Sequence, residues 1–326
     1  MRLLVTGGAG FIGSNYVRRI FDGSLAGVSS VLVIDKLTYA GVRSNLDEVI
    51  TRPDFDFQIG DISDYKLATK FIGSVDAIVN FAAESHVDRS IYDSSQFVQT
   101  NIAGVQTLLD AIKNQNREIR FLQVSTDEVY GSLNVGSWTE ESPLLPNSPY
   151  SATKAAGELL VRSYHRTHGL DVLITRCSNN YGPYHFPEKL IPLFITNLME
   201  GKKVPIYGNG KNVRDWLHVD DHCRAIHKVL MDGKSGEVYN IGGGRELSNI
   251  DITDLILDAM GADQSSIEFV EDRKGHDFRY SVDWTKIHEE LGYEPLVKFE
   301  DGLIETINWY KENEAWWKPL KLRAGL

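Results

Sequence analysis

The sequence predicts an α/β fold, a doubly wound parallel sheet followed by a smaller, mixed α/β lobe towards the C-terminus. Three observations support this prediction. Short apolar runs alternate with helical patterns up to Arg176, a glycine-rich turn follows the first apolar run, and the alternation stops after Arg176. With 326 residues, the chain is long enough for one large domain or two moderate ones.

The elements of the first half follow from local patterns. A helical pattern follows the glycine-rich turn and ends near Phe21, and two more helices are expected at about 102–113 and at 150–168. Short apolar or alternating runs are typical of strands, here at 2–6, 31–35, 55–59, 77–81, 121–125 and 172–176. Strands and helices in this alternating order form a Rossmann-type parallel sheet.

After Arg176 the pattern becomes irregular. Residues 179–189 are rich in Asn, Gly, Pro and aromatic side chains and are expected to form a loop, and glycines interrupt the apolar pieces of 203–214. A strand is expected at 238–241 and a helix near 303–317. We therefore expect a large domain at 1–178, to which about 214–242 returns, and a second lobe formed by 179–213 and 243–326.

Composition excludes several classes of function. Lys and Arg number 34 against 45 Asp and Glu, and the resulting net charge of −11 argues against nucleic acid as a partner. The sequence contains no run of 18 apolar residues, so no membrane span is expected. The opening MRLLVTGGAGFIG does not resemble a signal peptide. The two cysteines, Cys177 and Cys223, are far apart, which excludes a disulfide scaffold and favours a reducing, cytoplasmic location.

The glycine-rich turn predicts a dinucleotide site. Gly7, Gly10 and Gly13 stand at GxxGxxG spacing between the first strand and the first helix, where small residues let a pyrophosphate approach the helix N-terminus. Asp35, 22 residues beyond Gly13 at the end of the second strand, suits a ribose diol and so favours NAD over NADP. Asp61, after the third strand, either meets the adenine or caps a helix, and the sequence leaves both open.

Tyr150 and Lys154 form a YxxxK pair at the start of the long helix. A spacing of four places both side chains on one helix face, where an ammonium lowers the pKa of a nearby phenol. Tyr150 is therefore a candidate base for a sugar hydroxyl. The pattern alone is also typical of an interfacial Tyr beside a surface Lys, and only its context favours catalysis.

That context is Thr126, Asp127 and Glu128, which follow the fifth strand. Ligands of open α/β sheets bind at the carboxyl ends of the strands. Two adjacent carboxyl groups there suggest one acid and one base for a step beyond alcohol oxidation. The alternative is that one of them only caps the next turn.

Taken together, these motifs resemble the nucleotide-sugar-modifying branch of the extended short-chain dehydrogenase/reductase superfamily, and within it the dTDP-glucose 4,6-dehydratase family. The resemblance spans nearly the whole chain. Its most specific pieces are TDE at 126–128, AAESHVDRS at 82–90, NNYGPY at 179–184, PEKLIP at 187–192, GNGKNVRDW at 208–216, DRKGHD at 272–277 and RY at 279–280. His185 stands where the family pattern leads us to expect Gln.

The resemblance implies a reaction in three steps. Tyr150 takes the proton of the sugar 4-OH while NAD⁺ accepts the C4 hydride. Glu128 then removes the C5 proton and a protonated Asp127 delivers a proton to the departing 6-OH, so that water leaves. The hydride returns to C6, C5 is reprotonated, and a tightly bound NAD is regenerated. Thr126 is expected to hydrogen-bond the sugar 4-OH or the oxyanion that develops there.

The resemblance also implies the remaining site residues. Lys154 completes the catalytic set of Thr126, Asp127, Glu128 and Tyr150. The expected cofactor contacts are Gly7, Gly10, Phe11, Ile12, Gly13, Asp35, Lys36, Thr38, Asp61, Ile62, Ala82, Ala83, Ser85, Thr100, Tyr150, Lys154 and Asn180. The expected substrate contacts are Ser85, His86, Thr126, Asp127, Glu128, Asn179, Lys189, Leu190, Pro205, Tyr207, Arg214, Asn249, Arg273, His276 and Tyr280. Arg214 is the main candidate for the diphosphate, Lys189 and Arg279 are weaker ones, and His86 is alternatively a capping or packing histidine.

Several alternatives remain open on the sequence alone. A UDP-hexose 4-epimerase or a decarboxylase of the same branch, a dehydratase for CDP-glucose or GDP-mannose, and a non-catalytic NAD-binding regulator share the fold. His218, His222, Cys223 and His227 suggest a metal site, but they have no matching second cluster, so no metal is expected. The family suggests a homodimer formed through the helices near 102–114 and 150–168.

Overall fold

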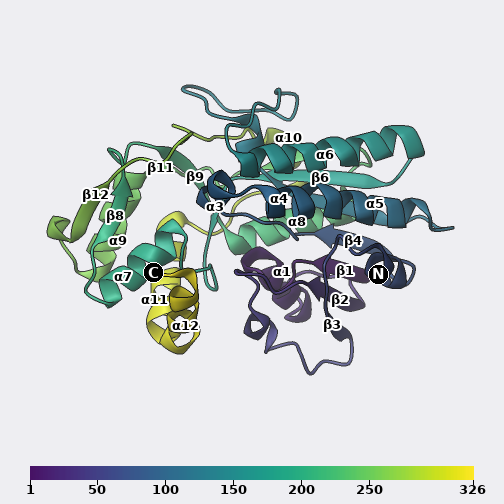
Figure 1. Cartoon of the computed structure of the whole chain (residues 1–326), viewed down its shortest axis with the longest axis horizontal. Coiled ribbons are helices and arrows are strands. Elements are labelled where there is room, and N and C mark those ends of the chain that lie inside the picture. The colour runs from purple at the N-terminus through teal and green to yellow at the C-terminus, as the bar shows by residue number, and fades with distance from the viewer.

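A seven-stranded, wholly parallel sheet forms the centre of the larger lobe in the computed structural model, which describes residues 1–326. Its strands, in spatial order, are β10 (Val238–Ile241), β6 (Val172–Cys177), β5 (Arg120–Thr126), β4 (Ala77–Asn80), β1 (Arg2–Thr6), β2 (Ser30–Asp35) and β3 (Phe55–Ile59). The order reverses at β1, between β4 and β2, which is where doubly wound sheets bind their ligands. The predicted fold class is confirmed (Figure 1).

Successive side chains of β1 point to opposite faces of the sheet, and both faces are covered by helices. Leu3 and Val5 belong to one buried cluster, whereas Leu4 belongs to another on the opposite face. The first face carries α1 (Phe11–Phe21) and α8 (Val219–Asp232). The second carries α2 (Tyr65–Ile72), α5 (Val105–Lys113) and α6 (Pro149–His168).

The smaller lobe has a core of its own. A three-stranded sheet joins β11 (Glu246–Ser248), β9 (Val213–His218) and β7 (Asn179–Tyr181), and β8 (Val204–Tyr207) pairs in parallel with β12 (Ile267–Val270). Around them pack α7 (Leu190–Met199), α9 (Asn249–Met260), α11 (Phe299–Glu312) and α12 (Glu314–Ala324). The short elements are α3 (Val87–Tyr92), α4 (Ser95–Val98), α10 (Thr285–Leu291), a π-helix (Gln99–Gly104) and 3₁₀ turns at Arg43–Leu46, Asp127–Tyr130 and Gln264–Ser266.

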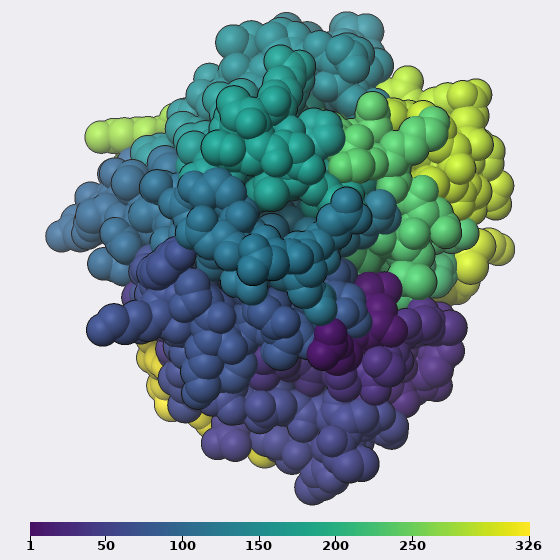
Figure 2. All heavy atoms as spheres, turned by 90° about the vertical axis from the view of Figure 1, so that its right-hand side faces the viewer, coloured from purple at the N-terminus to yellow at the C-terminus, as the bar shows by residue number.

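The second half of the chain returns to the larger lobe at two places. β10 extends its sheet beside β6, and α8 covers one face. Ile287 of α10 and Tyr293 belong to the same buried cluster, so part of the expected 243–326 lobe also lies here. Figure 2 shows green and yellow atoms beside purple and teal ones at this end of the molecule. The division of the chain into domains stays a prediction.

Local expectations differ from the structure at three places. The helix expected near 303–317 is two helices, α11 and α12, separated at Asn313. The helix expected from 102 begins as the π-helix Gln99–Gly104, and the loop expected at 179–189 opens with the strand β7. No helix is long and apolar enough to cross a membrane.

Candidate active site

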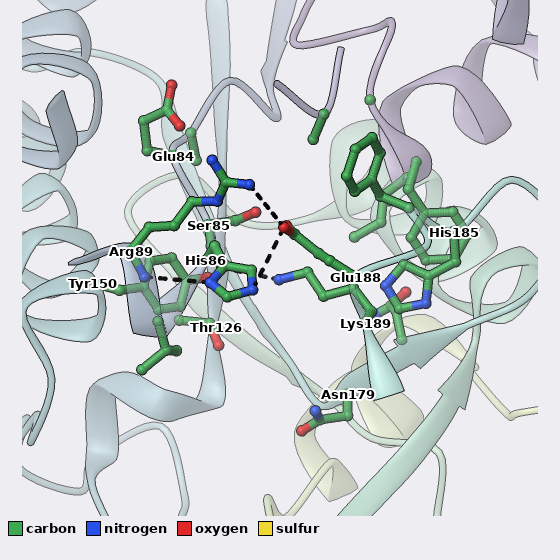
Figure 3. A pocket seen from close by; sticks show the side chains of 18 of the residues that line it. Glu84, Ser85, His86, Arg89, Thr126, Tyr150, Asn179, His185, Glu188 and Lys189 are labelled. Carbon is green, nitrogen blue, oxygen red and sulfur yellow. Dashed lines mark hydrogen bonds and ion pairs between the residues drawn. The ribbon is translucent and has the colours of Figure 1, made fainter. Parts of the chain in front are cut away.

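A cavity of about 690 Å³ opens where the carboxyl ends of the parallel strands face the smaller lobe, and its volume is typical of a ligand site. Every site residue expected from the sequence lines it except Tyr280 and Arg279. Figure 3 shows Tyr150 and Thr126 on one side of the cavity and His185, Glu188 and Lys189 on the other. The cavity therefore brings together residues from both lobes.

The glycine turn packs so closely that side chains are excluded. Gly7 has φ +68°, and a Cβ there would lie 2.6 Å from the backbone nitrogen of Ala82. A Cβ on Gly13 would lie 2.4 Å from the carbonyl oxygen of Gly7. The resulting open cradle at the N-terminus of α1 lines the cavity and fits a pyrophosphate, whose charge the helix end favours.

The two acidic residues beyond the turn are held in place by backbone and side-chain donors. The Asp35 carboxylate accepts the N–H groups of Ala9, at 2.9 Å, and Leu37, at 2.7 Å. Asp61 lies 2.7 Å from the ammonium of Lys36 and accepts hydrogen bonds from Ser63. The alternative that Asp61 caps a helix is wrong, because Asp64 is the N-cap of α2.

The start of α6 fixes Tyr150 and Lys154. Ser148 and Ser151 form a capping box around Pro149, which stabilises the first helical turn. The Tyr150 N–H donates to Ser90 Oγ at 3.2 Å, and Lys154 Nζ donates to the carbonyl of Val124 at 2.7 Å. Both side chains are buried and line the cavity.

Hydrogen bonds from the π-helix stabilise the start of α6. Asn101 Nδ2 donates to the Glu84 carbonyl at 3.1 Å and to Thr153 Oγ1 at 3.0 Å, and Asn101 Oδ1 accepts the Glu84 N–H at 3.0 Å. One buried amide therefore joins the segment after β4 to α6. Thr100 of the same π-helix lines the cavity.

Burial dominates the protonation of the Tyr–Lys pair. The pKa of Tyr150 is raised well above 10 by burial and by the charge of Glu128, while a hydrogen bond with Thr126 acts in the opposite direction. Burial lowers the pKa of Lys154 to about 8. The expectation that Lys154 lowers the Tyr150 pKa is wrong for this arrangement, because the ammonium is bound to the Val124 carbonyl.

The 3₁₀ turn Asp127–Tyr130 presents two carboxyl groups whose pKa values are both raised. Burial, then the charges of Glu128 and Asp215, raises the pKa of Asp127 well above its usual range. Burial also raises the pKa of Glu128, but the nearby cations Arg214 and Lys189 oppose that rise. The pair is therefore suited to one protonated and one ionised carboxyl group at neutral pH.

Neither carboxyl group caps the turn. Thr126 is the N-cap, with its hydroxyl accepting the Glu128 N–H at 3.3 Å and donating to Asp127 Oδ1 at 3.3 Å. Asp127 Oδ2 is buried with no hydrogen-bond partner. Since the capping alternative is wrong, both carboxyl groups are available for chemistry.

Glu188 is the site residue that the sequence analysis did not single out. Its carboxylate lies 3.2 Å from Arg89 Nη2 and 3.6 Å from His86 Nε2 (Figure 3), and Oε1 is buried without a partner. The sequence feature that could have identified Glu188 is its position between Pro187 and Lys189, two residues before the start of α7. Lys189 Nζ donates to the Ser85 carbonyl at 3.2 Å.

His86 both caps a helix and lines the cavity. Its Nδ1 accepts the Arg89 N–H at 3.3 Å and so caps α3, while the ring also lines the cavity. Burial, helped by the charges of Lys189 and Arg89, lowers the pKa of His86 to about 3, so the ring is neutral at pH 7.

The cationic side of the cavity carries Arg214 and Arg273. The Arg214 guanidinium donates to the carbonyls of Val213, Asp277 and Phe278 at 2.7, 3.0 and 3.3 Å, and it lies 4.4 Å from the centre of the Tyr280 ring. Tyr280 is thus behind Arg214 and not on the cavity wall. Arg273 lies 4.9 Å from the centre of the Tyr207 ring.

Arg279, the weaker candidate, lies outside the cavity wall and pairs with Glu246 at 2.7 Å. The histidines of α8 also have other partners. His218 caps the helix, His222 Nδ1 is 2.8 Å from Asn180 Oδ1, and His227 contacts Tyr16. No group of three His, Cys, Asp or Glu side chains is placed to hold a metal ion.

The chain resembles known proteins both in sequence and in structure. A family model described as GDP-mannose 4,6 dehydratase matches residues 4–306. A dTDP-glucose 4,6-dehydratase of Streptomyces niveus is 57% identical over 323 residues, which are 98% of this chain and 96% of that protein. The crystal structure of DesIV, a dTDP-glucose 4,6-dehydratase from Streptomyces venezuelae with NAD bound, is 58% identical, covers 98% of this chain and 100% of that one, and gives a TM-score of 0.96.

The chain belongs to the dTDP-glucose 4,6-dehydratase family. Epimerases of the same fold are clearly more distant from it. A UDP-glucose 4-epimerase of Thermotoga maritima is 30% identical, covers 96% of this chain and 100% of that one, and has a TM-score of 0.88. This chain is therefore about twice as identical to a dTDP-glucose 4,6-dehydratase (58%) as to the epimerase (30%), over nearly the full length of the chains in both comparisons.

Proposed function

We propose that this chain converts dTDP-glucose to dTDP-4-keto-6-deoxyglucose and water. The observation that carries the proposal is the Asp127–Glu128 pair near Tyr150. Asp127 is buried and Glu128 partly buried, both line one cavity, and their pKa values are raised to different extents. An epimerase needs only the oxidation of an alcohol and its reversal, whereas loss of water needs both an acid and a base.

NAD is the proposed cofactor. Bound NAD⁺ supplies the hydride acceptor for C4 oxidation and the hydride donor for C6. The cradle made by Gly7, Gly10 and Gly13 suits the pyrophosphate, and the Asp35 carboxylate suits a ribose diol and opposes a 2′-phosphate. The further proposed cofactor contacts line the same cavity: Phe11, Ile12, Lys36, Thr38, Asp61, Ile62, Ala82, Ala83, Ser85, Thr100, Tyr150, Lys154 and Asn180.

In the first step, Tyr150 accepts the proton of the sugar 4-OH as C4 is oxidised to a ketone. The phenolate form of Tyr150 becomes the phenol as it does so, and Lys154, whose ammonium donates to the Val124 carbonyl, is proposed to contact the cofactor. Thr126 offers a hydroxyl that hydrogen-bonds the 4-oxygen as its charge changes.

In the second step, the ketone makes the C5 proton acidic, and Glu128 removes it. Asp127 donates its proton to the departing 6-OH, so that water leaves and a 4-keto-5,6-ene remains. The buried environment keeps Asp127 protonated until the leaving group accepts the proton. After hydride addition at C6, Glu128 returns a proton to C5. The proton that Tyr150 took from the 4-OH then passes to solvent, and solvent returns one to Asp127, which restores both residues for the next molecule.

The nucleotide is proposed to lie towards the smaller lobe. Arg214 and Arg273 provide guanidinium groups for the diphosphate, and Lys189 adds an ammonium. Tyr207 and Pro205 offer flat and apolar surface, and Asn179 and Asn249 offer amide groups. Ser85, His86, Leu190 and His276 complete the proposed contacts on the cavity wall.

Turnover in D₂O tests this function directly. The proton that Glu128 removes exchanges with solvent, so each product molecule gains one deuterium at C5, whereas C6 receives a hydride from C4 and gains none. NMR of the product measures both positions. Deuterium at C6 contradicts hydride return, and a sugar nucleotide that loses no water favours an epimerase.

We further propose that the protein is a cytoplasmic homodimer formed through α5 and α6. Exposed apolar side chains at Tyr92, Val98 and Leu159, with exposed fractions of 95%, 47% and 55%, support an interface on this side. The two unpaired cysteines support a reducing compartment.

Light scattering tests the dimer. The wild type should give the mass of two chains, and Leu159→Lys should give that of one. Phe269→Lys, which changes an exposed apolar residue on β12, serves as the control and should remain a dimer. A monomeric wild type contradicts the proposal.

A further inference from the structure

We infer that α12 of the smaller lobe clamps the cofactor into the larger lobe, and that Trp316 does so through Asn45. This inference rests on the proposed function, because it takes NAD as the ligand. In Figure 1, α11 and α12, in yellow, lie between the smaller lobe and the purple β1–β3 region. Direct contacts join α12 to the segment that follows β2.

Asn45 forms the centre of this connection. Trp316 Nε1 donates to Asn45 Oδ1 at 2.9 Å, and Asn45 Nδ2 donates to the carbonyl oxygen of Ala9, inside the glycine turn, at 3.1 Å. The N–H of the same Ala9 donates to the Asp35 carboxylate at 2.9 Å. Asn45 is only 2% exposed. A helix of the smaller lobe is therefore connected by two hydrogen bonds to the turn that cradles the pyrophosphate.

Arg18 of α1 supports the same connection from a second direction. Its Nη1 donates to the backbone carbonyl of Asn45 at 2.7 Å, and its guanidinium lies 4.1 Å from the centre of the Tyr184 ring. Tyr184 in turn packs edge-on against Trp316, with the ring centres 5.6 Å apart. The first helix of the cofactor site, the loop before α7 and α12 thus form one packed unit.

An apolar cluster also joins α12 to the segment that follows β2. Val42, Phe186 and Leu320 are buried together, and Tyr39 and Ala324 pack against them. Tyr39, Phe186 and Ala324 also line the cavity, on the side where Asp35 lies. The Arg323 guanidinium adds a hydrogen bond to the Tyr39 carbonyl at 2.5 Å. α12 is therefore part of the cavity wall beside the expected adenosine half of the cofactor.

The chemistry explains why such a wall is useful. The reaction takes a hydride from the substrate and returns it to the same molecule, so the cofactor ends each turnover unchanged and has no need to leave. The sugar nucleotide, in contrast, must enter and leave every time. Loss of the reduced cofactor between the two hydride transfers would leave an oxidised sugar that cannot be completed. A clamp on the cofactor side alone suits this requirement.

Exchange of NAD in the absence of sugar nucleotide tests the clamp. Protein loaded with deuterium-labelled NAD is mixed with excess unlabelled NAD, and the retained label is followed by filtration and mass spectrometry. Trp316→Phe keeps an aromatic ring but removes the N–H donor, and we expect it to release NAD about five-fold faster, the effect of losing one hydrogen bond. Trp309→Phe is the matched control. Trp309 also packs against Tyr184, with the rings tilted by 47° and their centres 4.4 Å apart, and makes no side-chain hydrogen bond to Asn45.

A double variant tests the route through Asn45. Since Trp316 and Asn45 act in series, Trp316→Phe combined with Asn45→Ala should release NAD no faster than Asn45→Ala alone. Unchanged release from Trp316→Phe, or equal acceleration by Trp309→Phe, overturns the clamp even if the wild type holds NAD. A wild type that binds no NAD overturns the clamp and the proposed function together.

Discussion

Arg176 donates two hydrogen bonds to one carboxylate oxygen of Glu158, at 2.9 and 2.7 Å, and both side chains are fully buried between β6 and α6. Arg176 also donates to the hydroxyl of Tyr130 at 2.6 Å. Glu158 lies one helical turn beyond Lys154, and Tyr130 ends the turn that carries Asp127 and Glu128. One buried ion pair therefore joins the two segments that hold the proposed catalytic groups.

Breaking this ion pair should be costly, and replacing it should not be. Arg176→Met leaves the Glu158 carboxylate buried and unpaired, so we expect a loss of about 3–5 kcal/mol in the free energy of unfolding. Arg176→Met combined with Glu158→Leu removes both charges and should recover most of that loss. Urea denaturation measures both variants. A single variant as stable as the wild type contradicts this account of the pair.

Asp127→Asn should separate oxidation from elimination. The amide keeps the size of the side chain but has no acidic proton to give to the 6-OH, so C4 oxidation continues while loss of water slows by about 10²-fold or more. Absorbance of NADH and mass spectrometry of the sugar nucleotide follow the two steps. Wild-type rates of water loss in this variant would show that Asp127 is not the acid.

His222 should make stability depend on pH. Burial lowers its pKa to about 3 in the folded protein, whereas an exposed histidine titrates near 6.5. Below pH 6.5 the unfolded state therefore binds a proton that the folded state does not, and stability falls as the pH drops towards 3. Between pH 7 and 5 this one group should cost about 2 kcal/mol.

The matched variant is His222→Gln, which keeps a polar group near Asn180 but does not titrate. The free energy of unfolding at pH 7 and pH 5, measured for both proteins, should fall less in the variant. His86, also with a pKa of about 3, contributes equally to both proteins and cancels in the comparison. Equal falls in the two proteins contradict the role given to His222.

Gly7→Ala should prevent cofactor binding, and Gly23→Ala is its control. Both glycines have positive φ, +68° and +88°, so alanine is strained at either position by about 1–2 kcal/mol. Only at Gly7 does the new Cβ meet backbone, at 2.6 Å from the nitrogen of Ala82, while at Gly23 nothing lies within 4 Å. NAD content after purification should be lost for Gly7→Ala alone. Equal NAD content in both variants contradicts the close packing of the turn.

Strands of the central sheet could be predicted well because their signal is local. β1, β3 and β10 have the expected bounds, since each is a short apolar or alternating run that a glycine ends. The glycine turn, Asp35 and the Tyr150–Lys154 pair were also visible, because their chemistry depends on short, fixed spacings. All of these residues line the cavity.

What the sequence could not provide depends on contacts between distant segments. Tyr280 packs against Arg214 but does not line the cavity, and Glu188 meets Arg89 across 99 residues of chain. The pKa of Tyr150 depends on how deeply it is buried and on Glu128, not on spacing to Lys154 alone. The break at Asn313 between α11 and α12 also has no strong local signal, since neither Gly nor Pro stands there.

The central claim is that this chain removes water from dTDP-glucose with no net change in NAD. The most direct measurement is mass spectrometry after incubation of the purified protein and NAD⁺ with dTDP-glucose, UDP-glucose, CDP-glucose or GDP-mannose in separate tubes. We expect loss of one water from dTDP-glucose alone, without accumulation of NADH. An unchanged mass in every tube, from folded protein that holds NAD, would contradict it, and the roles given to Asp127 and Glu128 would be the first to be abandoned.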